Sequence, residues 1–258
     1  MPLLQVADLT KNFDGVRAVD QLSFHVGANE IIGLIGPNGA GKTTAINLIG
    51  GATPPDHGSI NFDGQSILGH TPHALVRLGL VRTFQATNVY RSKTVRENIY
   101  SGTFIHSYSG FWSNFANTPA SAMRRQQADR DVDEILEELQ LSEFANVSAA
   151  ELSYGHQKVL GLAIALASRP RLIMLDEPAA GLNDEEAERV ARTISRMNKK
   201  SLTVVVVDHN IRFIAGLCGR LVVLNYGSKL AEGKPKEVMA DPKVIEAYLG
   251  TDHDVIDG

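Results

Sequence analysis

The chain has 258 residues, of which 43% are hydrophobic and 21% are charged, and its formal net charge is −4. This length predicts one large α/β domain or two small ones, and the composition is ordinary for a globular protein. The slight negative charge excludes a global basic field that would attract nucleic acid or anionic lipid, so we expect no nucleic-acid partner.

Two features bear on the compartment. Residues 1–13 contain an early acid, Asp8, and no basic stretch before a long apolar run, so they do not predict a signal peptide. The longest aliphatic runs, such as residues 203–207, are too short to span a bilayer, so action at a membrane would require a partner. Cys218 is the only cysteine and lies beside Leu217, which predicts a buried thiol and fits a reducing, cytosolic compartment.

The first quarter of the chain predicts mainly strands. Alternating residues over 3–9 and 22–28 indicate two strands around a polar turn. Residues 30–36 form a continuous apolar run, typical of a strand buried on both faces, and lead through a glycine-rich turn into a helix over 42–51. Residues 58–67 predict a hairpin with its turn at Asp63-Gly64.

The middle of the chain predicts helices. Residues 92–102 and 158–167 indicate helices, whereas residues 107–121 are rich in Ser, Asn and aromatic residues and are interpreted as an irregular insert. Its aromatic side chains either dock a partner or pack locally, and both interpretations stay open. Residues 124–141 predict an amphipathic helix. Its apolar face is formed by Val132, Ile135, Leu136 and Leu139.

Strand signals return in the last third of the chain. Residues 171–177 and 202–209 predict buried strands, separated by a helix over 183–200. Residues 220–233 predict a hairpin that turns near Tyr226-Gly227, and residues 235–250 predict two short helices. Alternating buried strands and helices indicate an α/β fold with a mainly parallel sheet, into which a helical block over 85–165 is inserted.

A phosphate-binding pattern, G-x-x-x-x-G-K-[ST], matches residues 36–43 completely. Its glycines allow backbone N–H groups to surround phosphate oxygens, and the following helix directs its positive end at the anion. In this chemistry Lys42 reaches the β- and γ-phosphates, and Thr43 offers a hydroxyl to Mg²⁺. A chance glycine-rich turn is the alternative, but the pattern stands between a buried strand and a helix, as nucleotide binding requires. The predicted ATP-binding residues of the loop are Gly36, Pro37, Asn38, Gly39, Ala40, Gly41, Lys42, Thr43 and Thr44.

Two acids end the apolar strand within residues 172–178. Asp176 would lie beside the phosphate loop and hold Mg²⁺ through water, and Glu177 is placed to polarise an attacking water. Two carboxylates that only cap the next segment are the alternative, which the presence of a phosphate loop disfavours. These two motifs indicate a P-loop NTPase and leave kinases, GTPases and motor ATPases open.

Further motifs resemble those of the ATP-binding subunits of ABC transporters, in the same order and over essentially the whole chain. Separately, each has an ordinary structural explanation, such as Ser153 or Asn183 as a helix cap; their joint order and spacing favour the family. The matching segments are 12–20 (adenine-stacking aromatic), 81–85 (Q-loop), 152–157 (signature, LSYGHQ), 179–183 (D-loop) and 204–210 (switch strand).

The resemblance implies a P-loop NTPase core with a mainly parallel sheet, an N-terminal antiparallel β subdomain and an inserted α-helical subdomain. One nucleotide-binding domain would span 1–258, with its core in 1–85 and 166–258 and the helical subdomain in 86–165. It also implies ATP hydrolysis with Mg²⁺. The implied catalytic residues are Glu177, His209 and Gln85. The implied metal-binding residues are Thr43, Gln85 and Asp176. Besides the phosphate loop and Asp176, the implied ATP-binding residues are Phe13 and Ala18.

The resemblance implies a site shared between two subunits. The signature residues Ser153, Tyr154, Gly155 and His156 would contact ATP held by the other subunit, with the Ser153 side chain and the Gly155 N–H at the γ-phosphate. The D-loop residues would be Gly181, Leu182 and Asn183. ATP would close the two subunits and hydrolysis would release them.

The implied partners are a second ABC ATPase subunit, in a homodimer or heterodimer, two transmembrane permeases and a solute-binding protein. The implied location is the cytoplasmic face of the membrane. Four segments are similar to the ATPases of branched-chain amino acid importers: residues 82–85, residues 176–183, the tail over 225–250 and the insert between 100 and 130. That group includes relatives for amides and urea, and the ATPase of lipopolysaccharide export is also similar.

Soluble ABC ATPases of translation or DNA repair usually have two cassettes or long coiled-coil insertions, and neither feature is present. Several residues depart from the family pattern and bear on the efficiency of the signature half-site. They are Tyr154, His156, Val159, Ile164 and Asn183.

Overall fold

A small antiparallel sheet is formed by the N-terminal part of the protein. The structure is a computed structural model, which describes residues 1–83, 89–104 and 119–249. Asp14 and Gly15, with φ of 46° and 88°, make a tight turn, so the first hairpin is longer than the expected strands over 3–9 and 22–28. The strands, in the sheet order β2-β1-β4-β5, are β1 (Leu4–Phe13), β2 (Val16–Val26), β4 (His57–Phe62) and β5 (Gln65–Ser66).

The second sheet has six strands in the order β10-β9-β3-β8-β7-β6. Neighbours from β9 to β6 pair in parallel, and only the edge strand β10 runs antiparallel, which confirms the predicted mainly parallel sheet. Every residue of β7 and β8 is buried, because both faces of the sheet are covered. The strands are β3 (Ile31–Ile35), β6 (Leu80–Thr83), β7 (Leu172–Asp176), β8 (Thr203–Val207), β9 (Arg220–Asn225) and β10 (Ser228–Gly233).

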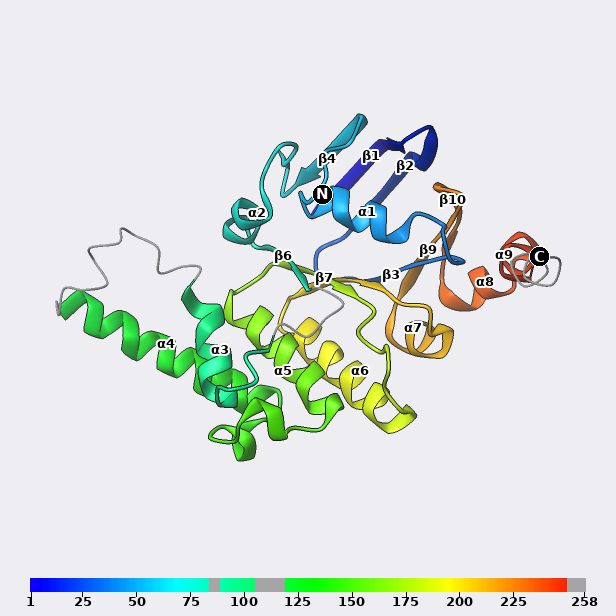
Figure 1. The fold of residues 1–258 in the computed structure, drawn as a ribbon. Coiled ribbons are helices and arrows are strands. Elements are labelled where there is room, and N and C mark those ends of the chain that lie inside the picture. Colours follow the sequence, from blue (N-terminus) through cyan, green and yellow to red (C-terminus); the bar gives the residue numbers. More distant parts are fainter. Residues whose placement is uncertain (84–88, 105–118, 250–258) are drawn as a thin grey trace.

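Helices cover both faces of this sheet. Val205 and Val207 belong to a core shared with the small sheet and the first helix, whereas Val204 and Val206 belong to a core shared with later helices. Figure 1 shows the same layers. The helix α1 and the small sheet lie on one side of β3 and β7, and α5, α6 and α7 lie on the other. These helices are α1 (Lys42–Ile49), α5 (Tyr154–Ala167), α6 (Asp184–Lys199) and α7 (Ile211–Leu217).

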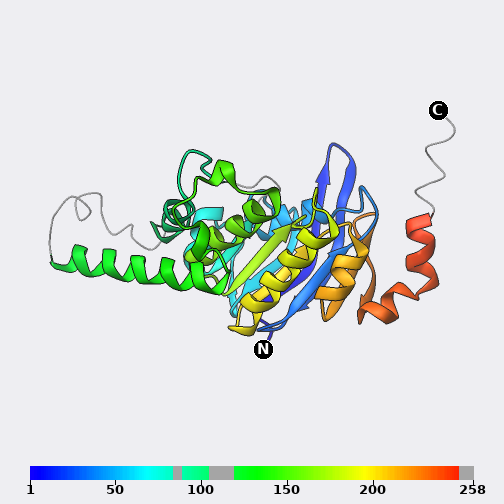
Figure 2. The ribbon, with the colours of Figure 1, turned by 90° about the horizontal axis from the view of Figure 1, so that it is seen from below.

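The remaining helices lie at the two ends of the molecule. Figures 1 and 2 show α4 projecting on one side and α8 and α9 lying on the opposite side. None of the helices in the described part of the chain combines the length and apolar composition needed to cross a bilayer. These elements are α2 (Pro72–Leu78), α3 (Val95–Thr103), α4 (Pro119–Glu138), the 3₁₀ helices η3 (Ser142–Phe144) and η4 (Ala149–Glu151), α8 (Pro235–Met239) and α9 (Pro242–Leu249).

The helices α3, α4 and α5 pack together beside the large sheet. The predicted apolar face of α4 is confirmed, since Val132, Ile135, Leu136 and Leu139 are buried. The helix begins at Pro119 and ends at Glu138, earlier at both ends than the predicted 124–141, so residues 119–121 are helical instead of irregular. The rest of the predicted insert, 107–118, lies outside the described residues.

Two α-helices and one strand, besides the 3₁₀ helices, were not predicted from the sequence. Helix α2 buries only Leu75, so it lacks the apolar period by which an amphipathic helix is identified. Strand β6 has four residues, and α7 has seven residues capped by the Asn210 side chain. The hairpins predicted over 58–67 and 220–233 and the two tail helices are confirmed.

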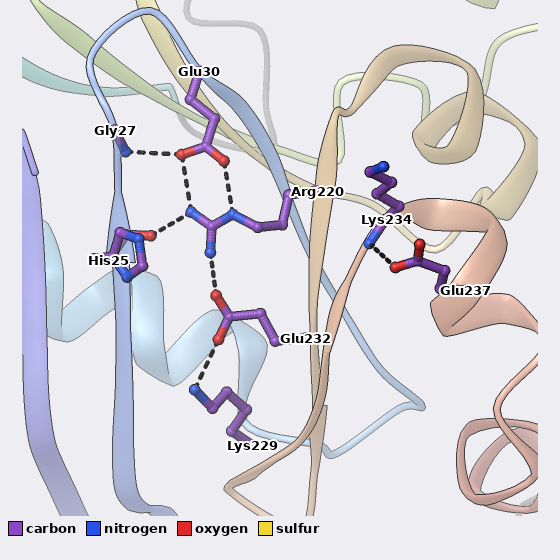
Figure 3. Close-up of polar contacts among 8 residues, drawn as sticks. All are labelled: His25, Gly27, Glu30, Arg220, Lys229, Glu232, Lys234 and Glu237. Carbon is purple, nitrogen blue, oxygen red and sulfur yellow. Dashed lines mark hydrogen bonds and ion pairs between the residues drawn. The ribbon is translucent and has the colours of Figure 1, made fainter.

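Arg220 is the first residue of β9 and joins three strands. It lies at the end of the large sheet that is opposite the phosphate loop. Its guanidinium donates to both carboxylate oxygens of Glu30, at 2.7 and 2.9 Å, and to the carbonyl oxygen of His25 at 2.7 Å. Figure 3 shows the same guanidinium paired with Glu232 of β10, which also accepts from Lys229. Arg220 therefore ties β2, β9 and β10 to the start of β3.

The pKa values of both acids reflect this cluster. Burial alone would raise the pKa of Glu30, but the hydrogen bonds from Arg220 and the Gly27 N–H outweigh it and lower the pKa. Burial also opposes the lowering of the Glu232 pKa, which Lys229 and Arg220 cause. Because both folded-state pKa values lie below the ordinary value of 4.5, the stability they contribute is present above that pH and is lost below it.

We expect Arg220→Met to lower the free energy of unfolding by about 2–3 kcal/mol near neutral pH, because it leaves Glu30 and Glu232 without their shared cation. The difference from the natural protein should shrink as the pH falls below about 4.5, where both acids become protonated. Urea denaturation at several pH values measures it. Arg17→Met removes an exposed pair with Asp20 and should cost less than about 1 kcal/mol; an equal loss in both variants would contradict a special role for Arg220.

Candidate active site

The phosphate loop connects the end of β3 to the start of α1. Gly36 and Gly41 have φ of 151° and 94°, and a Cβ atom at these positions would lie 2.2 Å from the carbonyl oxygen of Leu224 and 2.4 Å from that of Ala18. Both positions therefore require glycine, and Ala18 of β2 is the backbone against which the loop turns. Helix α1 begins after Gly41 without a side-chain cap and with no acid in its first turn, which leaves its N-terminal N–H groups to an anion.

The Lys42 ammonium lies over this loop. It donates to the carbonyl oxygens of Gly36 at 2.7 Å and of Pro37 at 2.8 Å. Burial lowers the pKa of Lys42, and the charges of Glu177 and Asp176 oppose that change. A phosphate oxygen is a charged acceptor and forms a stronger hydrogen bond with an ammonium than a carbonyl does. Lys42 is thus placed to exchange its loop partners for a phosphate.

Asp176 ends β7 and is 8% exposed. Its Oδ2 accepts from Arg82 Nη2 at 3.0 Å, and Arg82 Nη1 donates to Asn47 Oδ1 of α1 at 2.6 Å. The carboxylate is therefore held at the base of the phosphate loop, next to the helix that the loop begins. Arg82 was not predicted as a site residue, because an arginine in a short strand gives no sequence signal by itself.

Glu177 and His209 lie at the ends of neighbouring strands. Glu177 has a positive φ of 50°, and its N–H donates to the carbonyl oxygen of Val207 at 2.7 Å. Its Oε1 lies 3.8 Å from His209 Nδ1, and the His209 side chain is 63% exposed. A left-handed backbone at a non-glycine residue is uncommon, and it directs the Glu177 side chain away from the path of the strand. The two residues, each of which the resemblance assigns to catalysis, therefore lie close together.

Phe13 stands at the end of β1 and is 45% exposed. Lys11 Nζ lies 5.5 Å from the centre of its ring. The hairpin that ends at Phe13 continues into Ala18, whose carbonyl oxygen contacts the phosphate loop at Gly41. An exposed ring on this hairpin has the free face that stacking on a nucleobase requires.

The signature residues stand at the N-terminus of α5. Ser153 is the N-cap, as predicted, and its Oγ accepts from the His156 N–H at 3.3 Å. Tyr154 is 44% exposed, and the Gly155 N–H donates to Glu186 Oε1 of α6 at 3.1 Å. The Gly155 N–H, which the sequence assigns to a phosphate, is thus bonded to a carboxylate of the same chain.

The D-loop residues contact the signature residues of the same chain. A Cβ atom at Gly181, where φ is 75°, would lie 3.2 Å from the Tyr154 ring. Asn183 caps α6 through a capping box, in which its side chain accepts from the Glu186 N–H and its own N–H donates to Glu186 Oε2. Leu182 packs partly buried against the core. Glu186, which was not predicted, therefore bonds to both segments.

The structure brings two groups of predicted residues together separately. The first group, at the ends of β3, β7 and β8, contains the phosphate loop, Asp176, Glu177 and His209. The second group contains Ser153, Tyr154, Gly155, His156 and the D-loop. Its side chains contact α5, α6 and η3, and the start of the D-loop is bonded to Glu177 and Asp208 of the strand ends. Gln85 lies outside the described residues.

Two further side chains were not predicted. Asp208 is 2% exposed, and it accepts from the N–H groups of Ala179 and Asn210, each at 2.9 Å. Asp208 directly follows β8, just as Asp176 ends β7. An acid after a buried strand was therefore the sequence pattern by which Asp208 could have been identified. Burial raises the pKa of Tyr248 in α9, and a hydrogen bond with the Gly36 backbone opposes this increase. Through this bond the tail helix contacts the phosphate loop.

Cys218 has no place in this chemistry. It is buried, as predicted, and burial together with the charge of Asp208 raises its pKa to about 12. A thiol with this pKa is protonated near neutral pH and is a poor nucleophile.

Comparison with known proteins shows the family of the chain. The sequence model of the ABC transporter family matches residues 19–180, and that of the branched-chain amino acid ATP-binding cassette transporter matches residues 228–254. The branched-chain amino acid transport ATP-binding protein BraF of Pseudomonas aeruginosa is 38% identical over 96% of this chain and 98% of its own length. The lipopolysaccharide export ATP-binding protein LptB of Haemophilus influenzae is 32% identical over 97% of this chain and 98% of its own length.

Solved structures give the same result. A nucleotide-free ATP-binding cassette of an ABC transporter superimposes with a TM-score of 0.83 at 31% identity, over 96% of this chain and 98% of that chain. A dimeric cassette in a post-hydrolysis state, bound to ADP and Pi, gives a TM-score of 0.72 at 25% identity, over 90% of this chain and 98% of that chain. With a phosphate loop, an acidic pair and a family match over more than half of its length, the chain belongs to the ABC transporter family, as an ATP-binding subunit that hydrolyses ATP.

Proposed function

We propose that this ATPase drives the import of branched-chain or other hydrophobic amino acids. The observation that carries the substrate class is the match of residues 228–254 to the branched-chain amino acid group, because this tail lies outside the general family match over 19–180. The identity of 38% to BraF, over nearly the whole of both chains, supports it.

ATP would be bound between the first hairpin and the phosphate loop. Phe13 stacks on the base, Ala18 shapes the loop, and Lys42 exchanges its carbonyl partners for the β- and γ-phosphates, while N–H groups at the start of α1 contact phosphate oxygens. Glu177 accepts a proton from the attacking water, and His209 donates a hydrogen bond towards the γ-phosphate. Gln85 is assigned to the metal and the water by the family resemblance alone.

The donors at the loop suit Mg²⁺, which prefers oxygen ligands. The Thr43 hydroxyl in the first turn of α1 and the Asp176 carboxylate at the end of β7 would hold the ion, in part through water. When bound, Mg²⁺ supplies positive charge that neutralises the phosphates. In the present arrangement Arg82 donates to one oxygen of Asp176, so it orients that carboxylate.

A second ATPase subunit would complete the site with its signature residues. The separation of the two groups of site residues within one chain supports this, as does the dimeric form of a similar cassette. We further infer that α3, α4 and α5 belong to a helical subdomain over 86–165, between core segments 1–85 and 166–258. Two permeases and a solute-binding protein would complete the transporter, with this subunit at the cytoplasmic face of the membrane.

The proposal is tested by reconstituting the complex, with its permeases and binding protein, in lipid vesicles. Leucine, isoleucine or valine should stimulate ATP hydrolysis several-fold through the loaded binding protein, because solute binding shifts the transporter towards its ATP-closed state. Urea and acetamide serve as matched solutes, and stimulation by these alone would contradict the amino-acid assignment.

Export of lipopolysaccharide is the second candidate, supported by the 32% identity to LptB. Purification of the intact complex distinguishes the two. An importer should co-purify with permeases and with a binding protein that retains amino acid, whereas an exporter should retain lipid and no binding protein.

A further inference from the structure

His156 lies between Ser153 and a cation of α6. Its Nδ1 is 2.9 Å from Ser153 Oγ, and its Nε2 is 2.7 Å from Nη1 of Arg189. The Phe144 ring of η3 lies against the imidazole, with ring centroids 4.7 Å apart and an interplanar angle of 51°. The imidazole is thus held on both nitrogens and on one face.

Arg189 determines which nitrogen of His156 carries the proton. A guanidinium has only donors and stays charged, so the nitrogen that faces it must be an acceptor. Nε2 is therefore unprotonated, and the proton of the neutral ring is on Nδ1. The Nδ1–H then donates to Ser153 Oγ.

This donation determines the direction of the Ser153 hydroxyl. Oγ has two acceptor positions and one proton. It accepts from the His156 N–H at 3.3 Å and from the Nδ1–H at 2.9 Å, which uses both acceptor positions. The hydroxyl proton is left to point outwards from the exposed start of α5, where only an acceptor can bond to it.

We propose that His156 and Arg189 are positioning residues, which hold the Ser153 hydroxyl as a hydrogen-bond donor to the γ-phosphate of ATP bound by the second subunit. This inference rests on the proposed sharing of the site between two subunits. In the series Arg189, His156, Ser153 and phosphate, each hydrogen bond polarises the next, so the cation strengthens the last donor. Two donors were expected to contact the phosphate, the Gly155 N–H and the Ser153 hydroxyl. The Gly155 N–H is bonded to Glu186, so the Ser153 hydroxyl is the donor that is left for the phosphate.

The surroundings keep the imidazole neutral. Burial and then the charge of Arg189 lower the pKa of His156, while Glu143 of η3 and Glu186 of α6 oppose them. Arg192 and Arg196 of α6 line the same cavity, of about 390 Å³, as His156, and add positive charge. Protonation of Nε2 would place two cations against each other, so the arrangement excludes it near neutral pH.

The test is Arg189→Met in the assembled transporter. Without the guanidinium, the neutral ring can carry its proton on Nε2 and accept at Nδ1 from the Ser153 hydroxyl, which removes the donor. At about pH 8 we expect ATP hydrolysis to fall about tenfold, the loss of one hydrogen bond to a charged group. Removing the charge of Arg189 raises the pKa of His156, so the imidazole of the variant becomes protonated at a higher pH than that of the natural chain. As the pH falls, Nδ1–H again donates to Ser153, and part of the activity should return.

Two controls separate positioning from a structural defect. Arg171→Met removes an exposed arginine just before β7, which pairs with Asp63, and should leave activity unchanged over the same pH range. Arg189→Met combined with His156→Gln should show no recovery at the lower pH. Nitrogen NMR of the natural chain should report the Nδ1–H form of His156, and that of Arg189→Met the Nε2–H form at higher pH.

The inference is overturned if Arg189→Met and Arg171→Met have the same pH profile, or if NMR finds the proton on Nε2 in the natural chain. Failure of the proposed shared site has a different signature. In that case Ser153→Ala would also leave ATP hydrolysis unchanged, whereas failure of the positioning alone leaves Ser153→Ala impaired and Arg189→Met active.

Discussion

Glu177→Gln is expected to reduce ATP hydrolysis by about 10²–10⁴-fold, the usual contribution of a general base. The amide cannot accept the proton of the attacking water, although it has the size of the carboxylate. The backbone bond from Glu177 to Val207 does not involve the side chain, so the fold should be retained. Phosphate release, measured on the transporter or on the isolated chain, gives the loss.

Binding measurements provide the second half of this experiment. ATP affinity should change little, and the closed assembly of two ATPase subunits should accumulate because ATP persists within it. Glu134→Gln, which neutralises an exposed acid of α4, is the matched control and should hydrolyse ATP normally. Unchanged hydrolysis in Glu177→Gln would remove Glu177 from the mechanism.

Lys42→Ala should weaken ATP binding by about 10–100-fold, because the ammonium makes charge-assisted hydrogen bonds to phosphate. Hydrolysis at saturating ATP should fall further, by about 10²–10³-fold, since a charge that stabilises the transition state is lost. Isothermal titration with ATP and phosphate-release kinetics measure the two effects.

The loss of Lys42 also removes its bonds to Gly36 and Pro37, so a thermal melt without nucleotide must accompany the titration. Lys200→Ala removes the same charge at the end of α6, where it pairs with Glu138, and should bind ATP normally. An affinity for Lys42→Ala equal to that of the Lys200→Ala control would contradict the proposed phosphate contact.

The sequence predicted those parts of the fold whose patterns are local. The buried strands β3, β7 and β8 are continuous apolar runs, and the turns at Asp63-Gly64 and Tyr226-Gly227 each end in a glycine with positive φ. Helix α2 and strand β6 were missed because each is short, and α2 buries a single apolar residue, so neither presents a period.

Within the site, the same distinction holds. The phosphate loop and the acidic pair follow from spacing along the chain, whereas Arg82, Glu186 and Arg189 act through partners far away in sequence. Arg82 meets Asp176 across 94 positions and Arg189 meets His156 across 33. Single arginines or glutamates on a helix or strand are most often solvated, so their partners were identifiable only from coordinates.

Glu186 links the Gly155 N–H to the start of α6, which bears on the proposed contact with a second subunit. One of its oxygens accepts from the Gly155 N–H and the other from the Asn183 N–H, at 3.1 and 3.3 Å. A phosphate and a carboxylate cannot share one N–H donor, so an anion arriving at Gly155 competes with Glu186 directly. When an anion displaces Glu186 from the Gly155 N–H, the bond between Glu186 and the Asn183 N–H also changes. Anion binding at the start of α5 is therefore coupled to the start of α6.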